Sequence, residues 1–210
     1  MVVAAMGFYA DQIVPRIVNV ACGMGEAKEL RRRVCEGLEG EVLEIGFGSG
    51  HNVPFYPPAV TRVAAVDPSD VGWKLAGKRL GATATPVERC GVDGQSLPFA
   101  DDSFDAALST WTLCTIPDAD AALREVRRVL KPGKTLHFVE HGLAPDEQVR
   151  RWQHRLDPME QLIFDGCHLT RPIVDLLTSA GFTIAELDVF YEKGAPKAMG
   201  ADSLGIAVSP

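Results

Sequence analysis

A buried-strand pattern that runs directly into spaced glycines constrains this chain more than any other feature. Residues 42–50 read VLEIGFGSG, an apolar run that carries one acid and is followed by glycines at every second position. Such a run predicts a buried strand, and glycines let the backbone turn sharply and approach a ligand closely. The spacing differs from the G-x-G-x-x-G turn that nicotinamide and flavin folds prefer. The stretch therefore predicts a cofactor-binding turn of another kind.

Length and charge narrow the class of protein. The chain has 210 residues, the size of one domain with a substantial core. Its net charge is -7 and its pI about 5.2, and its basic residues form neither a stripe nor a patch with interleaved aromatics. This composition argues against a nucleic-acid partner and favours a small-molecule substrate.

Apolar runs and cysteines indicate the compartment. No apolar run approaches the ~20 residues that a membrane span needs, so we expect no integral membrane segment. The five cysteines lack C-x-x-C spacing, which suits a reducing compartment better than a disulfide framework or a zinc site. We therefore expect a cytoplasmic protein. The sequence does not indicate its oligomeric state.

Strand and helix patterns alternate after the glycine turn. Strands are predicted at 41–45, 62–66, 85–90, 104–109 and 135–139, with helices at 71–79, 118–130, 147–164 and 172–180. Two final strands, 183–189 and 204–208, follow each other without a helix. We expect a Rossmann-like, doubly wound α/β fold, with a mostly parallel seven-stranded sheet, helices on both faces and an antiparallel C-terminal strand.

The chain reads as one domain, 1–210, in three parts. Helical patterns at about 9–20 and 26–37 predict an N-terminal cap, 1–40, over the site. A cofactor-binding half, 41–140, and a substrate-side half, 141–210, would follow. Lys131-Pro132-Gly133 is expected to stop the preceding helix.

Acidic residues follow the second and third predicted strands. In an open parallel sheet the ligand lies beyond the carboxyl ends of the strands. Asp67 could accept both hydroxyls of a ribose there, or could form a turn before Pro68. Asp93 could accept an adenine amine, with Leu97 against the ring. Asp101-Asp102 reads as a solvated turn, and we expect no metal site.

Four segments that span most of the chain resemble the successive motifs of class I S-adenosylmethionine-dependent methyltransferases. They are VLEIGFGSG, AVDPS, DGQSLPFADDSFDAALS and ALREVRRVLKPGKTL. Within this family, the segments resemble the branch that is similar to ubiquinone and phosphatidylethanolamine methyltransferases. The resemblance implies S-adenosyl-L-methionine as cofactor and S-adenosyl-L-homocysteine as product. Two positions depart from it, since Gln95 stands where the family usually has an acid and Lys134 where it has glycine.

The resemblance also implies roles for residues that follow the predicted strands. These are Glu44 near the methionine amino group, Gly46, Gly48 and Gly50 in the close turn, Asp67 at the ribose, Asp93 with the Gly94-Gln95 backbone around the adenine, and Thr110 and Trp111 beside the methionyl part and the sulfonium. Trp111 could offer its π face to that cation or serve as a core aromatic.

A finer resemblance lies in FYADQIVPRIVNVACG, GSGHNVPFY and FDGCHLTRPIVDLLTSAGF. These segments are similar to bacterial relatives of methyltransferase-like proteins associated with thiol methylation. The membrane anchor that vertebrate members carry ahead of this region is not expected here. Lipid amines and quinones or phenols are the alternative acceptors.

Two histidines are candidate bases. A sulfonium leaving group needs mainly in-line positioning and a deprotonated nucleophile, and a thiol with a pKa near ~8.5 is already partly ionised. His141 follows the fifth strand and His168 precedes a helix, so either could take a proton, cap a helix or pack. A reaction without any base is a third reading, whereas a nucleophilic Cys167-His168 pair is disfavoured because adjacent side chains usually diverge.

The sequence raises two other function classes. A nucleotide-dependent oxidoreductase is disfavoured by the glycine spacing, by Asp93 and by the lack of a Tyr-x-x-x-Lys pair. A cofactor-binding protein without catalysis stays open.

Overall fold

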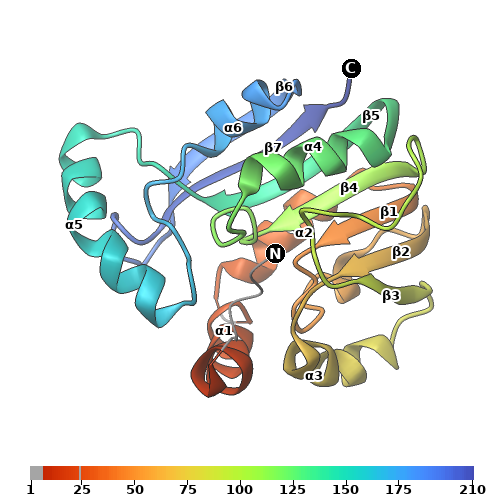
Figure 1. Cartoon of the computed structure of the whole chain (residues 1–210), viewed down its shortest axis with the longest axis horizontal. Coiled ribbons are helices and arrows are strands. Elements are labelled where there is room, and N and C mark those ends of the chain that lie inside the picture. The colour runs from red at the N-terminus through yellow and green to blue at the C-terminus, as the bar shows by residue number, and fades with distance from the viewer. Residues whose placement is uncertain (1–6, 24) are drawn as a thin grey trace.

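Seven strands form one mixed sheet in the order β3-β2-β1-β4-β5-β7-β6 (Figure 1). The structure is a computed structural model that describes residues 7–23 and 25–210. Its strands are β1 (Gly40–Ile45), β2 (Val60–Val66), β3 (Val87–Gly91), β4 (Phe104–Thr110), β5 (Leu130–His141), β6 (Thr183–Tyr191) and β7 (Ala201–Val208). Strands β1 to β5 pair in parallel, and β7 runs antiparallel to both of its neighbours. The expected Rossmann-like sheet is confirmed.

Helices cover both faces of this sheet. A π-helical turn, η1 (Tyr9–Ile13), leads into α1 (Val14–Ala21), and a 3-10 turn, η2 (Val53–Phe55), follows the glycines. The remaining helices are α2 (Ala27–Cys35), α3 (Asp70–Leu80), α4 (Ala119–Val129), α5 (Glu147–Ile163) and α6 (Ile173–Ser179). Figure 1 shows α4 and α6 on one face and α3 on the other.

Alternate side chains of each central strand enter the two cores. On β1, Leu43 and Ile45 join the core that contains Leu123 of α4 and Leu177 of α6. Val42 faces the other way and joins the core with Leu30 and Val34 of α2. Burying such side chains contributes about 1.5–3 kcal/mol each, which explains the continuous apolar runs that predicted these strands.

Polar side chains cap the N-termini of two helices. The Asp118 carboxylate accepts a hydrogen bond from the Ala121 amide (2.8 Å), and Ser69 does the same for Gly72 (2.9 Å). The expected stop at Lys131-Pro132-Gly133 lies elsewhere, because α4 ends at Val129 and β5 begins at Leu130. Those three residues form the irregular start of β5, where the pairing with β4 shifts register.

The carboxyl ends of the parallel strands meet near α1 and α5. Figure 1 shows both helices beyond the arrowheads of these strands. The Tyr9 hydroxyl donates a hydrogen bond to the Ile163 carbonyl at the end of α5 (3.0 Å). In the part of the chain that the structure describes, no helix is both long and apolar enough to span a bilayer.

Candidate cofactor and acceptor site

The glycine turn has the left-handed backbone that glycine tolerates best. Its φ angles are +69° at Gly46, +55° at Gly48 and +73° at Gly50. A Cβ atom at Gly46 would overlap the side chain of Thr112, whereas one at Gly48 would meet nothing nearer than 3.9 Å. Thr112 therefore packs against the turn at Gly46, whereas the space beside Gly48 is open, so that a ligand can approach the backbone there.

Asp67 at the end of β2 tethers this turn. Its carboxylate accepts hydrogen bonds from the Gly48 amide (2.7 Å) and the Ser69 amide (2.7 Å). Burial raises the pKa of Asp67, although both amides act to lower it. Each carboxylate oxygen can accept more than one hydrogen bond. The turn-forming role and the ribose role are thus compatible in one side chain.

Glu44 is the buried centre of a polar network between β1 and β4. Asn52 donates to one carboxylate oxygen (2.9 Å), and the Tyr56 hydroxyl donates to the other. Burial raises the pKa of Glu44 to about 7, against the opposing effect of these hydrogen bonds and of Arg31. Asn52 also donates to Thr110 (3.1 Å), which connects the ends of the two strands.

Arg31 completes the network from α2, and sequence reasoning missed it. Its guanidinium donates to Asn52 (2.7 Å) and Thr110 (3.0 Å) and lies 4.8 Å from the ring centroid of Trp111. Arg31 is only 5% exposed, and its buried Nε has no hydrogen-bond partner among the residues that the structure describes. The only sequence signal was its position between Leu30 and Val34 on the buried side of α2. One face of Trp111 is therefore covered by Arg31.

The residues after β3 form an exposed rim. The Asp93 carboxylate accepts from the Gln95 backbone amide (2.8 Å) and side-chain amide (2.9 Å), and Gln95 in turn accepts from the Asp118 amide (2.9 Å). Gln95 thus has a structural role that an acid could not reproduce, since a carboxylate cannot donate. Gly94 lies near Ile116. Leu97, expected against an adenine ring, packs in the core instead.

A cavity of about 500 Å³ opens beside this network. The end of α1 and the start of α2 line it, so both segments of the expected N-terminal cap contribute, while the rest of α2 packs on the sheet. Lys28, Arg31 and Arg79 give the cavity positive charge, and burial with these cations lowers the pKa of His51 to about 4. The lining contains no carboxylate, so the cavity suits an anionic group.

His141 is paired with a buried carboxylate that sequence reasoning also missed. Its Nδ1 lies 2.6 Å from Oδ1 of Asp202, which faces it across the β5–β7 pair. Burial acts to lower the pKa of His141, but the Asp202 charge outweighs it and raises this pKa to about 9. Trp111 donates from Nε1 to the other oxygen of Asp202 (3.4 Å). The Asp202 charge therefore favours the protonated form of His141 near neutral pH.

His168 and Cys167 point to different partners. His168 Nδ1 lies 3.6 Å from the Asp157 carboxylate, whereas the Cys167 thiol lies 3.7 Å from the thiol of Cys114. The geometry agrees with the expectation that these adjacent side chains diverge. The His168 amide also donates to the Cys114 carbonyl (2.9 Å), which joins this segment to the loop after β4.

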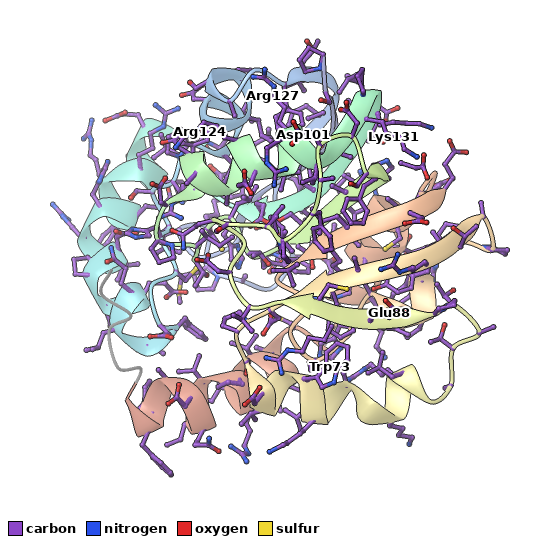
Figure 2. All side chains as sticks on the ribbon, turned by 45° about the vertical axis from the view of Figure 1, so that its right-hand side comes forward. Trp73, Glu88, Asp101, Arg124, Arg127 and Lys131 are labelled. Carbon is purple, nitrogen blue, oxygen red and sulfur yellow. The ribbon has the colours of Figure 1, made fainter. Side chains whose placement is uncertain are left out.

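The acidic turn before β4 lies against α4. Figure 2 shows Asp101 beside this helix, where it forms an ion pair with Arg128 (2.7 Å). Within residues 7–23 and 25–210, no three His, Cys, Asp or Glu side chains are grouped as metal ligands.

Known proteins share both the sequence motifs and the fold. Residues 43–138 match a family model described as "Methyltransferase domain". Human thiol S-methyltransferase TMT1A is 38% identical over 150 residues, which cover 70% of this chain and 61% of that protein. Demethylmenaquinone methyltransferase of Paenarthrobacter aurescens is 32% identical over 143 residues, 64% of this chain and 55% of that protein. The chain thus matches less than two thirds of the length of these curated relatives.

Solved structures agree on the architecture. A SAM-dependent methyltransferase from Thermotoga maritima superposes with a TM-score of 0.68 at 23% identity, over 94% of this chain and 99% of that one. Likeness at this identity speaks for the fold alone. Taken together, residues 43–138 match a methyltransferase domain, and the chain has the Rossmann-like fold of solved methyltransferases.

Proposed function

We propose that this chain transfers the methyl group of S-adenosyl-L-methionine to the sulfur of a small-molecule thiol. The observation that carries the proposal is the continuous set of contacts from the cofactor side to the acceptor side. Glu44, Asn52 and Arg31 join the end of β1 to Thr110, and Trp111 then reaches Asp202 and His141. A cationic histidine thus adjoins the expected methyl-donor region.

The cofactor would lie across the carboxyl ends of β1, β2 and β4. The open backbone at Gly48 with Asp67 would hold the ribose, and the rim from Asp93 to Gln95 would frame the adenine. Glu44 in its ionised form would suit the methionine amino group. Arg31, with its unpartnered Nε, suits the methionine carboxylate, which is the anionic group of this cofactor.

The acceptor would meet His141 as a thiolate. In the reaction the thiolate sulfur bonds to the methyl carbon, the carbon–sulfonium bond breaks, and its electron pair stays on S-adenosyl-L-homocysteine. A protonated His141 cannot accept the thiol proton, so its role is to attract the thiolate and raise its population, while the proton leaves to water. In-line positioning supplies most of the remaining acceleration. This assignment replaces the expected general base with a charge partner.

Charge favours thiols over amine acceptors. An amine acceptor would develop positive charge beside the imidazolium, which is unfavourable. A phenolate would be attracted like a thiolate, and the relative named demethylmenaquinone methyltransferase keeps a quinone-type acceptor as the second candidate. His168, paired with Asp157, remains the alternative catalytic histidine. A cytoplasmic location and an acceptor other than nucleic acid remain predictions.

A binding and transfer experiment tests the proposal. Calorimetry should detect competitive binding of S-adenosyl-L-methionine and S-adenosyl-L-homocysteine but no binding of NAD. Transfer of a radiolabelled methyl group should then be screened over alkyl and aryl thiols, phenols, amines and lipids. Thiols should give the largest kcat/KM. Cofactor binding with labelled phenols alone would overturn the thiol assignment, and binding without transfer to any acceptor would indicate a non-catalytic protein.

A further inference from the structure

Asp202 contacts His141 and Trp111, which form one wall of the expected acceptor site. Its carboxylate is fully buried, with Oδ1 2.6 Å from Nδ1 of His141 and Oδ2 accepting from Nε1 of Trp111 (3.4 Å). The two partners come from different strands, since His141 ends β5 and Trp111 follows β4. A single carboxylate therefore contacts both rings, whose centroids lie 6.2 Å apart.

Trp111 needs such a restraint because its backbone is strained. Its φ is +49°, a left-handed conformation that a bulky residue adopts rarely and at a cost of roughly 1–3 kcal/mol. The Trp111 amide donates to the Val139 carbonyl (2.8 Å), and Arg31 covers one face of the ring. The bond to Asp202 adds the contact that selects how the indole lies relative to His141.

We propose that Asp202 is a positioning residue, which holds the His141 imidazole and the Trp111 indole together as one wall that faces an anionic acceptor. The inference rests on the proposed function. Under this proposal, methyl transfer depends on a buried residue that need not touch the cofactor or the acceptor itself.

Other charged groups also face His141, and their effects on its titration must be distinguished from the effect of Asp202. Glu192 after β6, Glu160 on α5 and the Cys167 thiol all influence its titration, and burial raises the pKa of Glu192 to about 7. The pH dependence of the reaction rate alone would not distinguish the titration of His141 from that of these groups. The test therefore follows the His141 ring itself by NMR as well as the reaction rate.

The test compares Asp202→Asn with Asp188→Asn in the full chain. Asp188 on β6 forms an exposed ion pair with Arg33, so its amide variant makes the same chemical change away from the wall. In the wild type and in Asp188→Asn, His141 should stay protonated to about pH 9. In Asp202→Asn its pKa should fall to about 6.5 or below. With 1-propanethiol at pH 7.5, kcat/KM should fall at least tenfold in Asp202→Asn only.

The pH profile distinguishes positioning from a structural role. The high-pH loss of kcat/KM should move from near pH 9 to below pH 7.5 in Asp202→Asn, while the Kd for S-adenosyl-L-methionine stays within about twofold. An unchanged His141 titration or an unchanged profile would overturn the inference.

A second variant covers a failure of Asp202→Asn to fold. Trp111→Phe keeps an aromatic ring at this position but removes the Nε1 donor. The variant should lower kcat/KM for the thiol while leaving His141 protonated. If wild-type His141 titrates near its ordinary pKa, the inference fails even if thiols are methylated. If no thiol is methylated while His141 stays charged through Asp202, the proposed function fails instead.

Discussion

His141 and Asp202 face each other across the antiparallel β5–β7 pair, with Nδ1 and Oδ1 2.6 Å apart. The pair links the acceptor side of the site to the stability of the fold, because its charge attraction exists only when these strands are paired. A folded-state pKa of about 9 for His141 lies above the ordinary value of 6.5.

The first prediction is a loss of stability between about pH 6.5 and 9. Protonation of His141 stabilises the fold fully below pH 6.5, and this contribution disappears as the pH rises through 9. The loss amounts to at most about 3 kcal/mol, because each unit of pKa shift corresponds to about 1.4 kcal/mol. Urea unfolding of the wild type and Asp202→Asn over this range measures it. A parallel loss in both proteins would contradict the role of the pair.

Gly46 and Gly48 should respond differently to alanine. Gly46→Ala should destabilise the protein by several kcal/mol, because the new Cβ overlaps Thr112. Gly48→Ala should cost only the left-handed strain, roughly 1–2 kcal/mol, yet should weaken S-adenosyl-L-methionine binding at least tenfold. Gly133→Ala is the control, since Gly133 has φ +74° and open space far from the turn. Thermal unfolding and calorimetry separate the three, and normal affinity in Gly48→Ala would exclude the turn from the cofactor site.

Asp67→Ala should weaken both the cofactor complex and the turn. Two hydrogen bonds from ribose hydroxyls to a charged group contribute about 1.5–3 kcal/mol each, and the bonds from Gly48 and Ser69 are lost as well. The fold should therefore lose about 1–3 kcal/mol in addition to the binding energy. Asp70→Asn, at an exposed carboxylate on α3, serves as control. If affinity is unchanged while stability falls, Asp67 belongs to the turn alone.

Glu44→Gln should separate stability from binding. The buried acid prefers its protonated form, so the protein loses stability as the pH rises from about 4.5 through 7. A neutral amide avoids this loss, and the variant should gain up to about 3 kcal/mol relative to the wild type over that range. Cofactor affinity should fall roughly tenfold, because the charge opposite the methionine amino group is removed. Glu41→Gln, exposed on the same strand, should change neither quantity.

Arg31→Met should weaken binding in a way that depends on the cofactor carboxylate. Affinity for S-adenosyl-L-methionine should fall roughly tenfold to a hundredfold, as expected for the loss of a charge-assisted hydrogen bond. Affinity for the decarboxylated analogue should change much less. Arg32→Met, which loses only an exposed ion pair with Glu29, is the matched control. Equal losses for both ligands would assign Arg31 to the support of Asn52 and Thr110 alone.

The sequence by itself determined the main strands and helices, the glycine turn and the acid that follows β2. The run at Val42–Ile45 requires burial on both faces, and the glycines after it allow positive φ angles at three positions. Asp67 follows β2 in the chain, so its place near the glycines required only that β1 and β2 pair in parallel. These inferences succeed because they depend on contacts between chain neighbours and on the general rule that parallel strands end at one edge.

Only the tertiary structure decided what the acceptor side is made of. Sequence order placed His141 at a strand end, but its partner Asp202 depends on the register of β5 and β7, and a slip of one residue would turn that carboxylate to the other face. Arg31 became part of the site because α2 packs on the sheet and excludes water from a side chain that usually stays exposed. Charge states follow from such neighbours, since burial and nearby charges are what shift a pKa.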